Sequence, residues 1–259
     1  MSPVNSSSDT STSSSVTMSM TDHLRELRMR IVRSLIATAV GMVVVLSFYD
    51  PILRFLTQPY RDLCATNPQF SCDGSLFALG PLDGFAARIR IATWGGLILA
   101  MPVVFWQIWR FVAPGLDKNE KRYAVPFIAS ITILFAVGCW MAYWTLDKAL
   151  EFLISWSGSS VDQAYQVSKY VSLVTLMALA FGAGFLSPVL ILFLQLVGVV
   201  TPRVLVRQWR IAIMCIFVAA AVITPSGDPV SLFALSVPMT ALYFLAVLIG
   251  WLITRRRSR

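Results

Sequence analysis

The sequence predicts an all-α integral membrane protein with six transmembrane helices, on the evidence of its composition, the length of its apolar segments and the distribution of its charge. Of the 259 residues, 57% are hydrophobic and only 13% are charged, and the mean hydropathy is +0.72. A soluble domain of this length has too little interior to bury so much apolar surface. The composition therefore indicates a protein that crosses a membrane several times.

Six apolar segments are candidates for the spans. A helix needs about 20 mainly apolar residues to cross the roughly 30 Å hydrocarbon core. The fifth segment is shorter and reaches only about 20 Å at about 1.5 Å per residue. Either it extends through Trp209 and Pro225, or the bilayer is thinner there. Pro102, Pro188 and Pro238 each remove a backbone hydrogen bond inside a span and are predicted to bend their helices. The predicted spans are 31–49, 86–109, 123–144, 171–197, 211–223 and 230–253.

The positive charge is unequally divided by these spans. Fifteen Lys and Arg fall on the side of the two termini, and six fall on the other side. Cytoplasmic segments carry the excess of Lys and Arg, so both termini are predicted to be cytoplasmic. The six on the opposite side are Arg54, Arg61, Arg88, Arg90, Lys148 and Lys169.

The chain divides into one membrane domain and two tails. Residues 1–20 are rich in Ser and Thr, and we expect a disordered cytoplasmic tail rather than a secretory signal peptide, because a basic start and an apolar stretch are absent. Residues 21–253 form the predicted six-span domain, and residues 254–259 form a basic cytoplasmic tail.

Two of the four cysteines lie between the first and second spans. Cys64 and Cys72 would face an oxidising compartment, so a disulfide between them is predicted, with two free thiols as the alternative. Cys139 and Cys215 lie within spans and are expected to be small packing residues.

An acidic residue stands out in the basic segment 21–35, TDHLRELRMRIVRSL. Its apolar residues recur at spacings of three and four, which predicts a helix that continues into the first span. Glu26 then has two interpretations. It pairs with Arg30 four residues later, or it is a discrete carboxylate that accepts a guanidinium from a ligand.

A second acidic site lies in the segment FVAPGLDKNEKR, residues 111–122, between the second and third spans. Asp117 and Glu120 have the spacing of a helix capping box. Glu120 has, like Glu26, the alternative role of a carboxylate offered on a basic surface beside the membrane. Such a carboxylate binds arginine through two parallel hydrogen bonds, which lysine does not reproduce.

Three motifs together resemble the TatC family, the core subunit of the twin-arginine protein translocase. They are HLRELRMR at 23–30, FVAPGLDKNEKR at 111–122 and TPSGDP at 224–229, and they occur in the family's order over about residues 20–253. The resemblance implies a glove-shaped fold with six spans and a short fifth helix, which suits residues 211–223.

The resemblance also implies a function. TatC proteins bind the twin-arginine signal peptides of folded precursor proteins and export them with the single-span partners TatA and TatB, driven by the protonmotive force. We therefore expect a multi-pass protein of the bacterial inner membrane that forms homo-oligomers within a complex. The family's signal-peptide-binding positions match Glu26, Glu120 and Phe111, and its other functional positions match Pro59 and Asp228.

Three further positions are weighed against this pattern. The family commonly has Glu or Gln before the proline of the fourth span, but this chain has Leu186 in GFLSPVL, with Ser187 or Gln195 as the nearest polar substitutes. Thr224 and Ser231 border the last outer turn, where they either hydrogen-bond a partner helix or cap the turn. Asp228 is also an ordinary turn-forming residue.

The residues argue against other function classes. There is no phosphate-binding glycine loop and no set of nucleophile, base and orienting residue, so an enzyme is not predicted. The single histidine, His23, lacks the cluster that a metal site needs, and no cofactor or nucleic-acid partner is expected. A small-solute transporter would need charged residues or paired broken helices at mid-membrane, and no internal repeat supports one.

Overall fold

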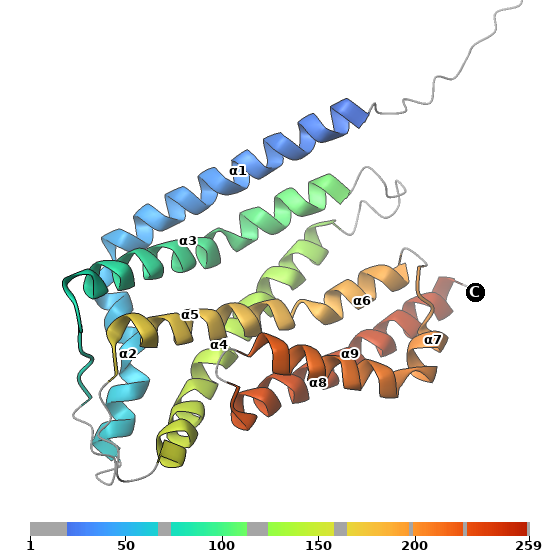
Figure 1. Ribbon diagram of the computed structural model, residues 1–259. Coiled ribbons are helices and arrows are strands. Elements are labelled where there is room, and N and C mark those ends of the chain that lie inside the picture. Colours follow the sequence, from blue (N-terminus) through green and yellow to red (C-terminus); the bar gives the residue numbers. More distant parts are fainter. Residues whose placement is uncertain are drawn as a thin grey trace, which may run out of the picture.

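The computed structural model describes residues 20–66, 74–112, 124–157, 165–196, 199–224 and 227–257, and this part of the chain is helical (Figure 1). Among these residues the only extended pairing is a single bridge between Phe77 and Gln166, which joins the segments that precede α3 and α5. The helices are α1 (Met20–Ser47), α2 (Tyr49–Thr66), α3 (Pro81–Val112), α4 (Ala124–Ser157), α5 (Val167–Gly184), α6 (Ser187–Leu196), α7 (Pro202–Arg207), α8 (Trp209–Ile223) and α9 (Pro229–Arg257).

Six membrane spans are present, as the sequence predicted. Five are long and apolar: α1, α3, α4, α5 together with α6, and α9. The sixth, α8, is shorter; its 15 residues reach about 22 Å at about 1.5 Å per residue. Of the two explanations for the short span, extension is partly confirmed, because the helix begins at Trp209, but it ends at Ile223 and remains short.

The helices alternate in direction, so their ends gather at two ends of the bundle. At one end, which we call the basic end, lie the N-terminal ends of α1 and α4 and the C-terminal ends of α3, α6 and α9 (Figure 1). The opposite end holds α2, the N-terminal ends of α3 and α5, and the C-terminal end of α4. The basic end carries Arg25, Arg28, Arg30, Arg33 and Arg110.

The fourth span is broken into two helices. The helical pattern stops at Gly184 and resumes at Ser187, immediately before Pro188. Proline has no N–H to donate and its ring collides with the preceding turn, so the break follows from Pro188. The bend predicted there is confirmed as a break, whereas α3 and α9 remain single helices at Pro102 and Pro238.

An additional helix, α2, lies between the first and second spans. The sequence predicted no helix between the spans 31–49 and 86–109, but residues 49–66 are helical. The helix is amphipathic: Thr57, Pro59, Tyr60, Leu63 and Cys64 are buried on one face. The other face is exposed and carries Asp50, Arg54, Gln58, Arg61 and Asp62.

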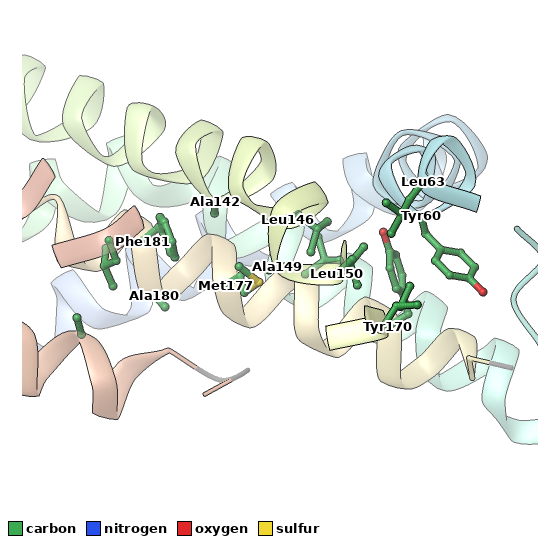
Figure 2. Packing of buried hydrophobic residues seen from close by; sticks show 14 of the residues in the cluster. Tyr60, Leu63, Ala142, Leu146, Ala149, Leu150, Tyr170, Met177, Ala180 and Phe181 are labelled. Atoms are coloured by element: carbon green, nitrogen blue, oxygen red, sulfur yellow. The ribbon is translucent and has the colours of Figure 1, made fainter. Parts of the chain in front are cut away.

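The largest buried cluster fixes α2 against the spans. Tyr60 of α2 is fully buried, and its ring centroid lies 5.4 Å from that of Tyr165 and 5.9 Å from that of Tyr170. The Tyr170 hydroxyl donates a hydrogen bond to the Leu56 carbonyl oxygen at 2.8 Å. Figure 2 shows Tyr60 and Tyr170 beside Leu146 and other buried side chains of α4. The cluster therefore joins α2, α4 and α5.

Glycines set the closest helix contacts. A Cβ on Gly41 of α1 would lie 2.6 Å from the Gly96 carbonyl oxygen, and a Cβ on Gly96 would lie 2.5 Å from the Met42 nitrogen. Between α4 and α5, a Cβ on Gly138 would lie 2.6 Å from the Phe181 carbonyl oxygen. Without a hydrophobic force between helices in lipid, such backbone contact supplies much of the packing energy. The α1–α3 pair thus depends on Gly41 and Gly96.

Substitution of Gly96 by alanine should test this contact. We expect Gly96→Ala to destabilise the protein by about 1–3 kcal/mol, because the added methyl group forces α1 and α3 apart. Gly84→Ala is the matched control on the same helix, since a Cβ there meets nothing within 4 Å. The measurement is the thermal stability of the detergent-solubilised protein. Equal stability of the two variants would contradict the close α1–α3 contact.

Candidate functional site

The basic end of α1 contains an ion pair between Glu26 and Arg30. The Nη2 atom of Arg30 donates to Oε1 of Glu26 across one helical turn. The pairing that the sequence offered as one interpretation is therefore present. The Arg30 side chain is only 11% exposed and that of Glu26 is 25% exposed. The pair is thus partly withdrawn from solvent, which strengthens it relative to a surface pair.

The other arginines of α1 differ from Arg30 in their surroundings. Arg25, Arg28 and Arg33 are exposed. They make this end of the helix strongly basic. Among the described residues, none of the three forms an ion pair with Glu26. The positive potential of these residues repels cations in general, so a cationic ligand is attracted only where the Glu26 carboxylate is within reach.

The end of α3 lies beside this part of α1. Phe111 is half-buried in the last turn of α3, and Gln107 lies four residues earlier, on the same face of the helix. The Oε1 atom of Gln107 is buried and has no hydrogen-bond partner among the described residues. The Nε and Nη1 atoms of Arg30 are also buried without a hydrogen-bond partner among the described residues. Buried polar atoms without partners are rare in proteins and mark places where a ligand or a rearrangement can satisfy them.

The second predicted carboxylate is not placed by the structure. Glu120 and Asp117 lie outside the described residues, and so does the rest of the segment 113–123. Glu120 therefore stays a sequence-based prediction. Of the three predicted signal-binding residues, the structure places Glu26 and Phe111, both at the basic end.

The turn between α8 and α9 places Thr224, Asp228 and Ser231 close together in the chain and buries all three. The Thr224 hydroxyl donates to the Ala220 carbonyl oxygen at 2.6 Å, at the end of α8. Asp228 precedes α9, and its Oδ1 accepts a hydrogen bond from the Ser231 backbone N–H at 2.6 Å. Asp228 is thus an N-cap, followed by proline at the first helical position. The capping role that the sequence offered for Thr224 is present, whereas the cap of α9 is made by Asp228 and not by the Ser231 hydroxyl.

Ser231 has a second feature at this turn. Its side chain is fully buried, and its hydroxyl oxygen has no hydrogen-bond partner among the described residues. Ser236, further along α9, is in the same condition. The backbone of Ser231 is therefore used by the cap, while its hydroxyl is not.

Pro59 lies within α2 and is buried. Its neighbour Tyr60 is part of the cluster that holds α2 against α4 and α5. A proline in the interior of a helix removes one backbone hydrogen bond, so its presence here depends on that tertiary packing.

Leu186 occupies an apolar environment. It is half-buried in the break between α5 and α6 and packs against a cluster that includes Phe105, Trp109, Ile128 and Phe135. Gln195 lies further along α6, is buried, and donates from Nε2 to the Ala246 carbonyl oxygen at 3.4 Å. The fourth span thus offers an amide against α9 instead of a carboxylate before the proline.

The cysteines agree in part with the prediction. Cys64 is disulfide-bonded, whereas Cys139 and Cys215 are free thiols. Cys72 lies outside the described residues, so the Cys64–Cys72 pairing stays a prediction. The Cys139 thiol lies 3.4 Å from the Ala178 carbonyl oxygen, consistent with a packing role between α4 and α5.

Sequence reasoning missed Gln107 at the basic end, and it paired Arg30 with Glu26 without predicting how little of the Arg30 side chain is exposed. For Gln107 a signal was available, because it is a polar residue within an apolar span and stands one turn before Phe111. The i,i+4 spacing from Glu26 singled out Arg30, but nothing in the local sequence indicated that its side chain would be less exposed than those of Arg28 and Arg33.

Comparison with known proteins places these features in a family. The family model described as "Sec-independent protein translocase protein (TatC)" matches residues 22–238. A Sec-independent protein translocase protein TatC from Frankia casuarinae is 39% identical over 93% of this chain and 68% of its own length. The TatC protein of Xylanimonas cellulosilytica is 35% identical over 93% of this chain and 87% of its own.

The fold agrees with a solved structure. The crystal structure of the twin arginine translocase receptor TatC superposes with a TM-score of 0.73 and 31% sequence identity. The match covers 90% of this chain and 99% of the other. A second crystal structure of that receptor, determined in the detergent DDM, gives the same TM-score and identity over 88% of this chain.

Substitutions of Asp228 can distinguish its role as the N-cap of α9 from a role of its negative charge. We expect Asp228→Ala to lower stability by about 1 kcal/mol, because the Ser231 N–H loses its acceptor. Asp228→Asn and Asp228→Ser should retain most of the stability, since both side chains cap a helix. Thermal stability of the purified protein in detergent is the measurement. Loss of stability in all three variants alike would show that the carboxylate has a role besides capping.

The predicted Cys64–Cys72 disulfide can be tested with a membrane-impermeant maleimide on intact cells. We expect little labelling before reduction and labelling of two additional thiols afterwards, because both cysteines are predicted to lie on the outer side. Cys64→Ser should leave Cys72 reactive without reductant. Full labelling of the unreduced wild-type protein would contradict the pairing.

Proposed function

The chain belongs to the TatC family of Sec-independent protein translocase proteins, and we propose that it is the core subunit that binds twin-arginine signal peptides of folded precursor proteins. The observation that carries the proposal is the position of Glu26. It is a partly exposed carboxylate on the first helix, among exposed arginines, at the basic end of the bundle.

The chemistry of recognition follows from the guanidinium group. Arginine presents a planar fork of N–H donors that matches a carboxylate, and charge-assisted hydrogen bonds of this kind are about twice as strong as neutral ones. Glu26 accepts one arginine of the signal peptide, and Glu120 accepts the other. Phe111, on α3 beside the first site, supplies an apolar contact for the adjoining part of the signal peptide.

The orientation assigns this recognition to the cytoplasm. With the excess of Lys and Arg at the basic end, both termini lie in the cytoplasm and α2 lies on the outer side of the bacterial inner membrane. Precursors are made in the cytoplasm, so the basic end is where a signal peptide first meets the protein. Transport then proceeds to the outer side and is driven by the protonmotive force.

Partner proteins complete the translocase. The single-span proteins TatA and TatB dock against the spans, and further copies of this chain assemble within the complex. The buried, polar turn containing Thr224, Asp228 and Ser231 lies on a short hairpin, α8 and α9, that offers a docking position in the outer half of the bilayer. Pro59 supports the outer helix α2 in the same half.

Removing either carboxylate tests the recognition. We expect Glu26→Ala and Glu120→Ala each to weaken signal-peptide binding about ten- to a hundredfold, because each loses a charge-assisted pair worth about 1.5–3 kcal/mol. Replacing the two arginines of the signal peptide by lysines should have a similar effect, since lysine keeps the charge but loses the fork. Precursor affinity is measured in membrane vesicles, with protein abundance checked by blot.

Glu151→Ala is the matched control. Glu151 lies near the opposite end of α4, is exposed, and pairs with Lys148 at 3.1 Å, so its removal also breaks a local ion pair. Its binding should equal that of the wild type. Wild-type affinity in the Glu26→Ala and Glu120→Ala variants would return both residues to local structural roles worth only about 0.2–0.5 kcal/mol.

A further inference from the structure

We propose that Arg30 is an internal competitor for the Glu26 carboxylate, so that a signal peptide binds by exchanging its own guanidinium for that of Arg30. This inference rests on the proposed signal-peptide binding by Glu26. It joins the two interpretations of Glu26, because the local ion pair is the resting state and the ligand pair is the bound state.

The first support is the geometry of the resting pair. Arg30 is turned inward and is 11% exposed, while Arg25, Arg28 and Arg33 on the same helix are exposed. Its Nη2 atom occupies Oε1 of Glu26. An incoming arginine needs the same carboxylate, so it meets a chemically identical group already in place.

The second support is the incomplete hydrogen bonding of Arg30. Its Nε and Nη1 atoms are buried without partners among the described residues, so the guanidinium does not use its full fork. A ligand arginine that binds the carboxylate through two parallel hydrogen bonds gains what Arg30 lacks. The resting pair is therefore strong enough to occupy Glu26 and weak enough to be displaced.

The third support is an acceptor for the displaced side chain. The antiparallel helices α1 and α3 touch where Gly41 meets Gly96. Arg30 lies eleven residues before Gly41, and Gln107 lies eleven residues after Gly96, so equal helical rise brings them to about the same height. The buried Oε1 of Gln107 has no partner among the described residues. It can accept a hydrogen bond from Arg30 once Glu26 is taken by the ligand.

The exchange has consequences for charge and for specificity. The Glu26 carboxylate keeps a cationic partner in both states, while the displaced Arg30 exchanges its carboxylate partner for the neutral Gln107 oxygen, and this loss limits how tightly the ligand binds. A lysine on the ligand offers one point of contact instead of a fork and displaces Arg30 poorly. The cost of displacing Arg30 is the same for an arginine and a lysine ligand, so competition by Arg30 lowers both affinities by the same factor and leaves the discrimination between them to the Glu26 carboxylate itself.

The test compares Arg30→Gln with Arg33→Gln in the full-length protein reconstituted in nanodiscs. The two variants lose the same charge from the same helix, but of these two arginines it is Arg30 that forms the recorded ion pair with Glu26. The probes are a synthetic twin-arginine signal peptide and its twin-lysine version. We expect Arg30→Gln to bind both peptides about three- to tenfold more tightly and to leave the ratio of the two affinities unchanged, because the competitor is removed for both. Arg33→Gln should leave both affinities close to the wild-type values, because Arg33 is exposed and has no recorded ion pair with Glu26.

Two further variants make the outcome decisive. Arg30→Lys keeps the charge and the stem without the fork, and an intermediate gain is expected; it also serves if Arg30→Gln fails to fold. In the Glu26→Ala background, Arg30→Gln should give no gain, because there is no carboxylate to release. The exchange is overturned if both Arg30 variants bind the peptides no more tightly than Arg33→Gln does. In that case, weaker peptide binding by Glu26→Ala still supports the proposed function. Wild-type binding by Glu26→Ala would instead remove the proposed function itself.

Discussion

Hydrogen bonding of the backbone within its own helices is the constraint on which this structure depends. In the hydrocarbon core an unpaired N–H or carbonyl costs several kcal/mol, so a spanning chain without a barrel has to be helical. Hydroxyl side chains follow the same rule: Thr175 donates to the Val171 carbonyl oxygen at 2.7 Å and Thr240 to that of Ser236 at 2.8 Å. The departures are few. The described chain breaks its helical pattern within a span only before Pro188, and the turn after the short α8 is capped by Thr224 and Asp228.

Helices whose backbone hydrogen bonds are complete gain little from the hydrophobic effect when they associate in lipid, so their association depends on close van der Waals packing. Gly41 and Gly96 let the backbones of α1 and α3 touch, and Gly138 does the same for α4 against Phe181 of α5. The first contact also has a functional result. It fixes the height of α1 against α3, and so it sets Arg30 level with Gln107 and brings Glu26 to the level of Phe111. Packing in the middle of the membrane thus determines the geometry of the site at its edge.

The parts of the fold that could be predicted from sequence are those with a local signal. Apolar length and charge bias belong to each segment alone, which is why six spans and the break at Pro188 were expected. Helix α2 was missed because its signal is amphipathic and is interrupted by Pro59, which is tolerated only when Tyr60 is buried against α4 and α5. The inward orientation of Arg30 was not predictable either. Local sequence pairs Arg30 with Glu26, but only the fold decides that Arg30 is less exposed than Arg28 and Arg33.

The two polar regions of the protein differ in how fully their groups are used, and this difference has consequences for binding. At the turn before α9, the Asp228 carboxylate and the Thr224 hydroxyl serve as caps and are buried. The Ser231 hydroxyl has no partner among the described residues, but its side chain is fully buried and does not reach the surface. At the basic end, Arg30 and Gln107 retain buried atoms without partners among the described residues. A ligand that enters this end changes which groups are paired, and it gains energy from groups that the resting protein leaves incompletely bonded. The basic end therefore retains polar groups whose pairing a ligand would change, whereas the carboxylate and hydroxyl of the turn before α9 already serve as caps.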